Sequence, residues 1–175
     1  MQMQLCVWSG KVGTNRMRDG GQIVTAYLDS NVFIYFFEGR ADEAIAARNL
    51  LSAAKSGQRR FVTSELTLAE VLAPASERIP LTAGQREQYI DLIARNETID
   101  IRPVTREILF STAEMRRFTR HKLPDAIHCA TAVNAGCRYM VSHDRQMARM
   151  PGDMTWIDVT VDGVNTLVEA IDAAR

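Results

Sequence analysis

Residues 23–31, Ile-Val-Thr-Ala-Tyr-Leu-Asp-Ser-Asn, contain the pattern that decides the fold. The apolar, β-branched first half of this stretch predicts a buried strand. Ser30 and Asn31 are favoured helix N-cap residues, and the apolar residues 32–37 that follow predict a helix. Asp29 is therefore expected at the C-terminal edge of a first, central strand. Open α/β sheets bind ligands at this edge, so Asp29 is the first candidate for a functional residue.

The rest of the chain alternates between strand and helix patterns. Further strands are expected at 60–63, 98–104, 138–141 and 154–159. Further helices are expected at 41–56, 65–72, 82–95, 105–119, 123–135 and 165–174. Strands that alternate with helices of this length predict a mostly parallel sheet of about five strands, covered by helices on both faces. The expected fold class is therefore a three-layer, Rossmann-like α/β fold.

The composition indicates one folded domain without a membrane span. The chain has 175 residues, of which 46% are hydrophobic, and its formal net charge is zero. No apolar run is long enough to cross a bilayer, and residues 5–8 are too short for a signal-peptide core, so a cytoplasmic protein is expected. The cysteines are odd in number without CxxC spacing, which argues against a disulfide framework or a zinc site.

Residues 1–22 differ from the chain that follows. Four glycines and several cations occur here with little hydrophobic periodicity. This composition predicts a flexible extension outside a domain that covers residues 23–175. Met17 lies just upstream of the first strand, so translation that starts there is an alternative to a start at Met1.

Four acidic residues occupy matching places in the predicted topology. Asp29 and Asp144 end two strands, Glu70 lies on the helix after the second strand, and Asp125 lies in the first turn of helix 123–135. Each also has a structural alternative: Asp29 and Asp144 as helix caps, Glu70 as a solvent-facing helix acid, and Asp125 as a partner of the helix dipole. Two carboxylates about 4 Å apart repel by roughly 4 kcal/mol at an effective dielectric constant near 20, so such a cluster requires protonation or a cation. Oxygen ligands select a hard ion. With no His or Cys expected as a ligand, the sequence predicts Mg²⁺, with Mn²⁺ as the alternative.

Four segments in order resemble the PIN-domain family, most closely the toxin subunits of the VapBC type. These segments are residues 27–31, 63–72, 123–132 and 141–144, and the resemblance covers about residues 24–160. It implies a metal-dependent endoribonuclease that cuts single-stranded or loop RNA and leaves 5′-phosphate and 3′-hydroxyl ends. It also implies a cognate antitoxin and a homodimer.

The resemblance assigns roles by position. Asp29 and Asp125 match the metal-binding aspartates of the family, and Glu70 and Asp144 match its other two catalytic acids. Two residues are assigned supporting roles in the same way. Ser142 matches a small polar residue of the site, and Asn31 matches the polar neighbour of the first aspartate. One departure is His143, since many members carry Asn at that place.

A basic cluster before the fourth segment is a candidate RNA contact. Arg116, Arg117, Arg120 and Lys122 precede the helix that carries Asp125, and could hold a phosphate backbone or complement a helix end. Phe118 is expected in the core, with a base-stacking platform as the alternative. His128 is expected in the core or supporting the site, with metal ligation as the alternative. The aromatic helix at 32–37 and the helix at 41–56 could form a groove for an antitoxin segment.

Three other functions are alternatives to the nuclease. A haloacid-dehalogenase-like phosphatase requires a second acid two residues after the first, where this chain has Asn31. A phospho-receiver domain requires an adjacent acidic pair near the first strand and a late lysine, and neither is apparent. A catalytically silent PIN-like module that binds RNA or protein is the main alternative, although the acids of the site are all present.

Overall fold

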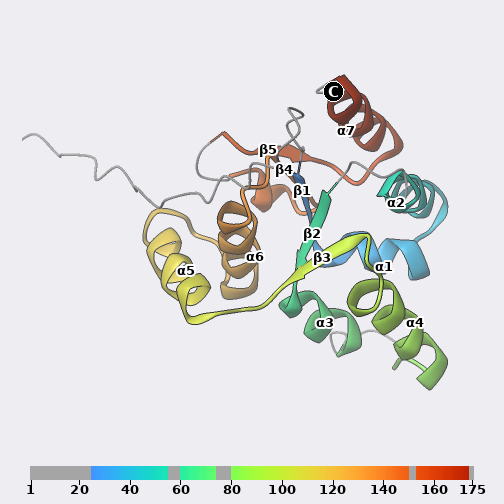
Figure 1. Cartoon of the computed structure of the whole chain (residues 1–175), viewed down its shortest axis with the longest axis horizontal. Coiled ribbons are helices and arrows are strands. Elements are labelled where there is room, and N and C mark those ends of the chain that lie inside the picture. Colours follow the sequence, from blue (N-terminus) through green and yellow to red (C-terminus); the bar gives the residue numbers. More distant parts are fainter. Residues whose placement is uncertain (1–24, 55–59, 74–79, 150–152, 174–175) are drawn as a thin grey trace, which may run out of the picture.

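The computed structural model describes residues 25–54, 60–73, 80–149 and 153–173. Within these ranges a five-stranded, fully parallel sheet lies between helices on its two faces (Figure 1). The strands are β1 (Thr25–Leu28), β2 (Arg60–Ser64), β3 (Ile99–Arg102), β4 (Tyr139–Val141) and β5 (Thr155–Ile157). The helices are α1 (Ser30–Glu38), α2 (Ala41–Ala54), α3 (Glu65–Leu72), α4 (Ala83–Ala94), α5 (Arg106–Phe118), α6 (Leu123–Asn134) and α7 (Val161–Ala173), with a 3-10 helix η1 (Arg145–Ala148). The predicted three-layer α/β architecture is confirmed.

The strand order places β1 in the middle of the sheet. The order is β3-β2-β1-β4-β5, so the chain first builds outward from β1 on one side and then adds β4 and β5 on the other. The direction of winding reverses between β1 and β4, and in such sheets the ligand crevice opens beyond the carboxyl ends of these two strands. Leu28 pairs with Val141, and the Asp29 amide donates a hydrogen bond to the Val141 carbonyl oxygen at 3.0 Å. The residues that follow β1 and β4 therefore emerge side by side.

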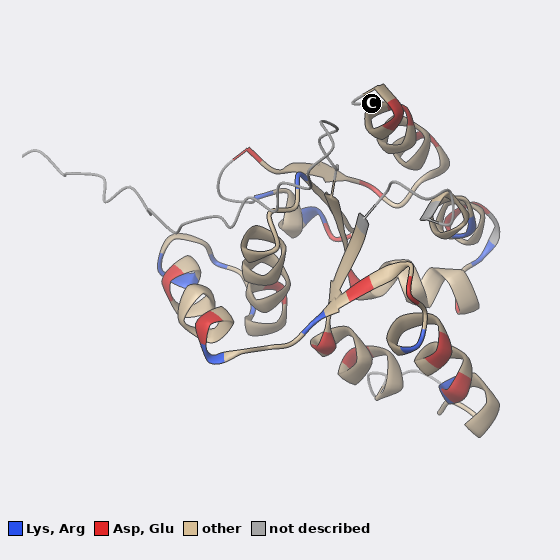
Figure 2. Cartoon of the chain, viewed as in Figure 1, with Lys and Arg blue, Asp and Glu red and all other residues tan. Residues whose placement is uncertain are grey.

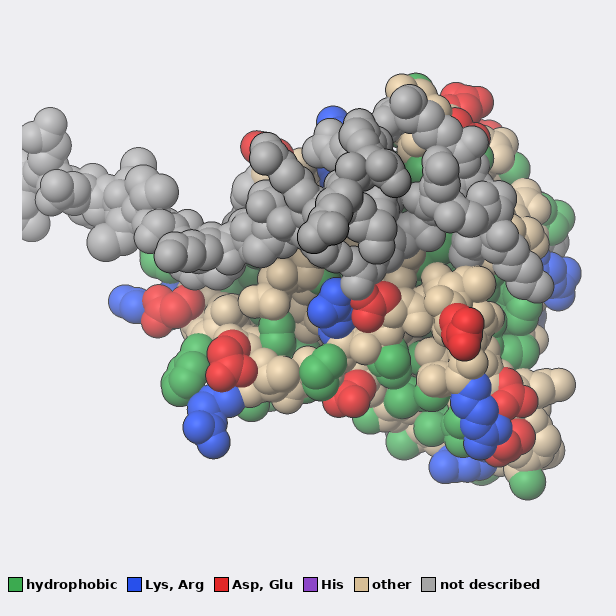
Figure 3. Space-filling view, viewed as in Figure 1, with side chains coloured by type: hydrophobic (Ala, Val, Ile, Leu, Met, Phe, Trp, Pro, Cys, Tyr) green, Lys and Arg blue, Asp and Glu red, His purple; other side chains and the backbone are tan. Residues whose placement is uncertain are grey.

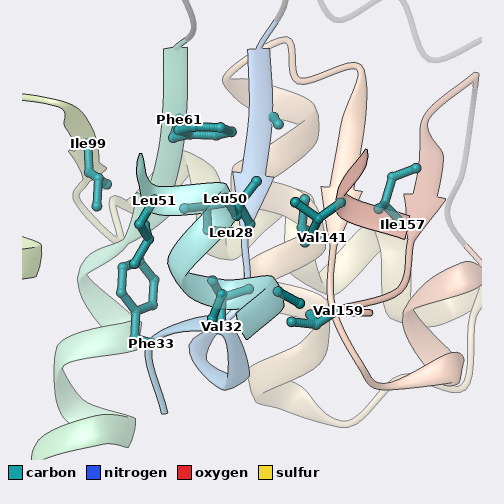
Figure 4. Packing of buried hydrophobic residues seen from close by; sticks show 14 of the residues in the cluster. Leu28, Val32, Phe33, Leu50, Leu51, Phe61, Ile99, Val141, Ile157 and Val159 are labelled. Carbon is teal, nitrogen blue, oxygen red and sulfur yellow. The ribbon is translucent and has the colours of Figure 1, made fainter. Parts of the chain in front are cut away.

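Successive side chains of β1 point to opposite faces of the sheet and pack against different helices there. Ala26 and Leu28 belong to the large apolar cluster that includes α1, α2 and α7. Figure 4 shows this side, where Phe33 and Leu50 pack beneath the strands; both are completely buried. Burying side chains of this size stabilises the fold by about 1.5–3 kcal/mol each relative to exposure. This packing fixes α1, and with it the chain that leaves β1.

Helix α6 covers the opposite face. Its Cys129 and Ala132 pack with Tyr27 of β1 in a second cluster, and α5 packs outside α6 through Ile108 and Ile127. Figure 1 shows α5 and α6 together on this side of the sheet. Helix α6 ends as the sequence predicted, before a glycine: Gly136 has a φ of 68°, a left-handed conformation that residues with a Cβ rarely adopt.

Three local predictions were wrong. The caps predicted at Ser30 and Asn31 were wrong: helix α1 begins at Ser30, and its N-cap is Asp29, whose side chain accepts a hydrogen bond from the Ser30 amide, as in the structural alternative for Asp29. Helix α7 begins at Val161, four residues before the expected start, and the Gly163 amide donates to the Thr160 hydroxyl at 3.1 Å. Helix η1 was not predicted, since four residues are too few to show a period.

The flexible extension predicted for residues 1–22 lies outside the described residues. In the part of the chain that is described, no helix is long and apolar enough to cross a membrane.

Charge is dispersed over much of the molecule. Acidic and basic positions interleave along α4 and α5 in Figure 2. On the face seen in Figure 3, outside the area under grey atoms, acidic and basic side chains are scattered among apolar ones. A surface for a charged partner must therefore be local, as the zero net charge implies.

Candidate metal and catalytic site

Asp29 is held rigidly at the end of β1. Its carboxylate accepts hydrogen bonds at 2.7 Å from the Ser30 amide, the Asn31 side-chain amide and the Ser142 hydroxyl. The residue is only 7% exposed, so its orientation is set by these donors rather than by water. Asn31 also donates to the Ser142 hydroxyl at 3.1 Å. The two residues predicted to support the site therefore touch Asp29 and each other.

Glu70 reaches the same place from α3 and meets a histidine. His128 Nε2 lies 2.8 Å from Glu70 Oε2 and 3.8 Å from Asp29 Oδ1. Because a carboxylate only accepts hydrogen bonds, Nε2 carries the hydrogen that joins His128 to Glu70. The Ser30 hydroxyl also donates to Glu70 Oε2. On the other side of the ring, His128 Nδ1 lies 2.7 Å from the hydroxyl of Tyr27, which points into the α6 side of the sheet.

The pKa values of these groups respond to burial and to one another. Burial raises the pKa of Asp29 more than His128 and its hydrogen-bond donors lower it. For Glu70, burial is the largest single influence and raises the pKa, but the hydrogen bond and charge of His128, with Ser30, together leave it lowered. Burial likewise lowers the pKa of His128, yet Glu70, Asp29 and Asp125 together leave it raised. The neighbouring carboxylates thus favour the charged form of His128 more than water favours that of a free imidazole.

The other two predicted acids lie around this centre. Asp125 is half-buried in the first turn of α6, one helical turn before His128, and its charge contributes to the raised pKa of His128. It has no hydrogen-bond or ion-pair partner among the described residues. Asp144 instead caps η1, where its side chain accepts from the Gln146 amide at 2.8 Å. Its own amide donates to the Ser142 hydroxyl at 3.0 Å, which connects it to Asp29.

The donor set fits a divalent cation. Ligand atoms of Asp29, Glu70 and His128 all lie within 4.8 Å of one another, although His128 could bind an ion only if its Nε2 lost the hydrogen that it donates to Glu70. Asp125 adds a carboxylate without a partner among the described residues. A buried carboxylate whose pKa is raised by desolvation is one that a cation would stabilise in its charged form. Carboxylate oxygens favour Mg²⁺ or Mn²⁺, and an imidazole nitrogen favours the transition metal of the two.

The sequence prediction that no histidine is placed near the acids as a soft ligand was wrong, because His128 Nε2 lies 2.8 Å from Glu70 Oε2. His128 follows Asp125 by three residues on the same helix, which was the available signal for its position. Its buried hydrogen bonds to Tyr27 and Glu70 agree with the expected supporting role. Tyr27 was not singled out, because an aromatic residue inside a strand is usually only core.

Two of the four residues of the predicted basic cluster have partners in the described part of the chain, and two do not. Arg116 Nε donates to the His121 carbonyl oxygen at 3.4 Å, and Arg117 pairs with Glu114 at 3.0 Å. Arg120 and Lys122 are exposed and have no such partner among the described residues. Phe118 was expected in the core, and this was wrong, because its side chain is 85% exposed. Phe118 is the last residue of α5. It lies beside the side of the helix that faces the protein, which is formed by Ile108, Thr112 and Met115.

Comparisons with known proteins agree with the fold. Among solved structures, a toxin-antitoxin complex from Klebsiella pneumoniae matches at 25% identity and a TM-score of 0.53, over 72% of this chain and 92% of that chain. VapBC2 from Rickettsia felis bound to a promoter DNA fragment matches at 16% identity and a TM-score of 0.56, over 77% and 98%. DNA-bound VapBC from Salmonella typhimurium matches at 17% identity and a TM-score of 0.54, over 78% and 98%. No curated protein matches the chain significantly.

Fold and site together define a class of protein: a parallel α/β domain with an acidic, metal-competent centre at its topological switch point. The family model of the PIN domain matches residues 26–153. The chain belongs to the PIN domain family.

Proposed function

We propose that this protein is a metal-dependent endoribonuclease and the toxin component of a type II toxin–antitoxin system. The observation that carries the proposal is the convergence of Asp29, Glu70 and His128 at the switch point of a PIN domain. The similarity to a toxin-antitoxin complex from Klebsiella pneumoniae supports the biological setting. Family membership favours nuclease chemistry.

In this proposal Asp29 and Asp125 hold a Mg²⁺ or Mn²⁺ ion, and Glu70 and Asp144 act directly or through water. A bound divalent ion lowers the pKa of its water and neutralises charge on a scissile phosphate. Ser142 and Asn31 hold Asp29 through its Oδ2, and Oδ1 lies 3.8 Å from His128 Nε2. His128 holds Glu70 and, through Nε2–H, balances part of its negative charge until the ion binds.

Tyr27 lets His128 serve in either protonation state. Burial raises the pKa of Tyr27 well above its usual value, so the phenol keeps its proton. Its hydroxyl can donate to Nδ1 of a neutral imidazole, or accept from Nδ1–H when the ring is charged. The hydrogen bond of 2.7 Å can therefore form in both protonation states of His128, including one that would follow if the site took up a metal ion.

A cleavage assay with a matched substitution tests this function. The purified full chain is expected to cut single-stranded RNA with Mg²⁺ or Mn²⁺ and not with EDTA, leaving 5′-phosphate and 3′-hydroxyl ends. Asp29→Asn keeps the shape of the side chain but weakens the metal site, and is expected to abolish cleavage and to relieve growth arrest on expression. Asp162→Asn, on the exposed start of α7, is the control and should cleave normally. Full activity of Asp29→Asn would contradict the proposal.

The proposed partners are a cognate antitoxin and a second copy of the chain. For the antitoxin, the proposed groove lies along α1 and α2, where Ile34, Tyr35, Phe36 and Phe37 are half-buried and Ile45 is 45% exposed. An antitoxin cation that reached Glu70 or Asp29 there would compete with the metal ion. Co-expression with the product of an adjacent small gene should give a complex with reduced cleavage. Absence of both complex and inhibition would count against this partner.

A further inference from the structure

A basic cavity lies beside the proposed catalytic site, between the end of α5 and η1. Its volume is about 620 Å³, and its lining includes Arg120, Arg145 and Arg149. Exposed Phe118 also lines it. None of these three arginines has a counter-charge or hydrogen-bond acceptor for its side chain among the described residues. Positive charge is thus concentrated around a hollow with an aromatic ring.

The two sides of the cavity are joined by a buried histidine. His121 is 5% exposed, and its Nε2 lies 3.0 Å from the carbonyl oxygen of Gln146 in η1. A carbonyl oxygen only accepts, so Nε2 is the protonated nitrogen of the ring. His121 Nδ1 then faces the thiol of Cys129 at 3.7 Å. These contacts hold the α5–α6 connection against η1, so the cavity is a built feature of the fold.

A short chain of contacts leads from the cavity to the proposed catalytic site. Helix η1 is capped by Asp144, whose amide donates to Ser142, and Ser142 donates to Asp29. On the other side of the cavity, Arg120 precedes the first turn of α6, where Asp125 lies. The cavity and the acidic centre therefore share the same edge of the sheet.

We propose that this cavity binds single-stranded RNA, with Arg120, Arg145 and Arg149 on its phosphates and Phe118 stacked against one unpaired base. Arginine supplies planar, permanently charged donors for phosphate, and an aromatic face binds a base once it has left a duplex stack. The carboxylates of an acidic peptide would satisfy the arginines but leave the ring in water. The inference deepens the proposed ribonuclease function, for which it supplies a place beside the acidic centre that selects unpaired RNA.

The arginine assignment predicts a salt-dependent change in binding. Anisotropy of a labelled oligouridylate of about ten nucleotides is measured with the full chain in EDTA, over a range of salt concentrations. Arg145→Gln with Arg149→Gln is expected to weaken binding and to reduce the slope of log affinity against log salt by about 1.4, or about 0.7 for each lost phosphate contact. Arg106→Gln, on the exposed first turn of α5 and outside the cavity lining, is the matched control and should leave the slope unchanged.

The stacking assignment predicts a different signature. Phe118→Leu is expected to weaken binding about tenfold with an unchanged salt slope, because stacking involves no counterion release. Phe110→Leu is the matched control, since Phe110 is another exposed aromatic residue on α5, at 67%, and lies outside the cavity lining. Since Phe118 is 85% exposed, its replacement should leave the melting temperature within about 2 °C of the wild type.

The outcomes separate this inference from the proposed function. Wild-type binding by the cavity variants, or equal weakening in the controls, overturns the inference even if RNA is cleaved in Mg²⁺. Equal affinity for polyglutamate, lost in the same variants, also overturns it and assigns the cavity to an acidic polypeptide. The expected binding pattern without cleavage in Mg²⁺ or Mn²⁺ would support the RNA site and reject the nuclease.

Discussion

Replacing Ser142 with alanine tests how the site holds Asp29. The Ser142 hydroxyl is completely buried, donates to Asp29 Oδ2 at 2.7 Å and accepts from Asn31 Nδ2 at 3.1 Å and the Asp144 amide at 3.0 Å. Loss of a hydrogen bond to a charged group costs about 1.5–3 kcal/mol. The other two donors add about 1 kcal/mol together, because Asn31 keeps its bond to Asp29 and Asp144 is only half-buried.

The sum predicts that Ser142→Ala lowers the free energy of unfolding by about 3 kcal/mol, and the melting temperature by about 6–12 °C for a chain of this length. Urea unfolding at pH 7.5 in EDTA measures this loss without metal binding. Ser52→Ala, on the exposed side of α2, is the control and should change the free energy by less than about 0.5 kcal/mol. A loss below about 1 kcal/mol for Ser142→Ala, with an unchanged urea slope, would refute the reasoning.

Two further predictions concern protons and metal. In the metal-free protein the pKa of His128 is raised above its ordinary value of 6.5, so above that pH the folded state binds more protons than the unfolded state, and stability should fall as pH rises through the folded pKa. Urea unfolding from pH 6 to 9 should show this decline in the free energy of unfolding, and His128→Gln should flatten it. A wild-type free energy of unfolding that rises over this pH range would contradict the prediction. Millimolar Mg²⁺ or Mn²⁺ should raise the melting temperature, by about 5–10 °C at a hundredfold excess over the dissociation constant. The Asp29→Asn variant should lose this rise, and an unchanged wild-type curve would exclude a metal site of useful affinity.

Local patterns were sufficient to predict the layers of the fold. The apolar run before Asp29, the helix that starts at Leu123 with Pro124 in its first turn, and the glycine after it each predict a structure within a few residues. Such signals depend on the backbone propensity of each residue and on the period of the hydrophobic pattern. Both are properties of residues that are neighbours in the chain. The start of α7 and the short η1 were missed because they depend on a single cap and on packing.

The sequence alone determined an α/β fold with Asp29 at the end of its first strand, because alternation and caps are local properties. Only the tertiary structure decided that His128 lies between Asp29 and Glu70, that Asp144 caps η1, and that Phe118 faces solvent. It also brought Arg145 and Arg149 to Arg120, which no spacing in the chain predicts. These juxtapositions follow from strand order and from which helix face is buried, and both are set by contacts between residues far apart in the chain.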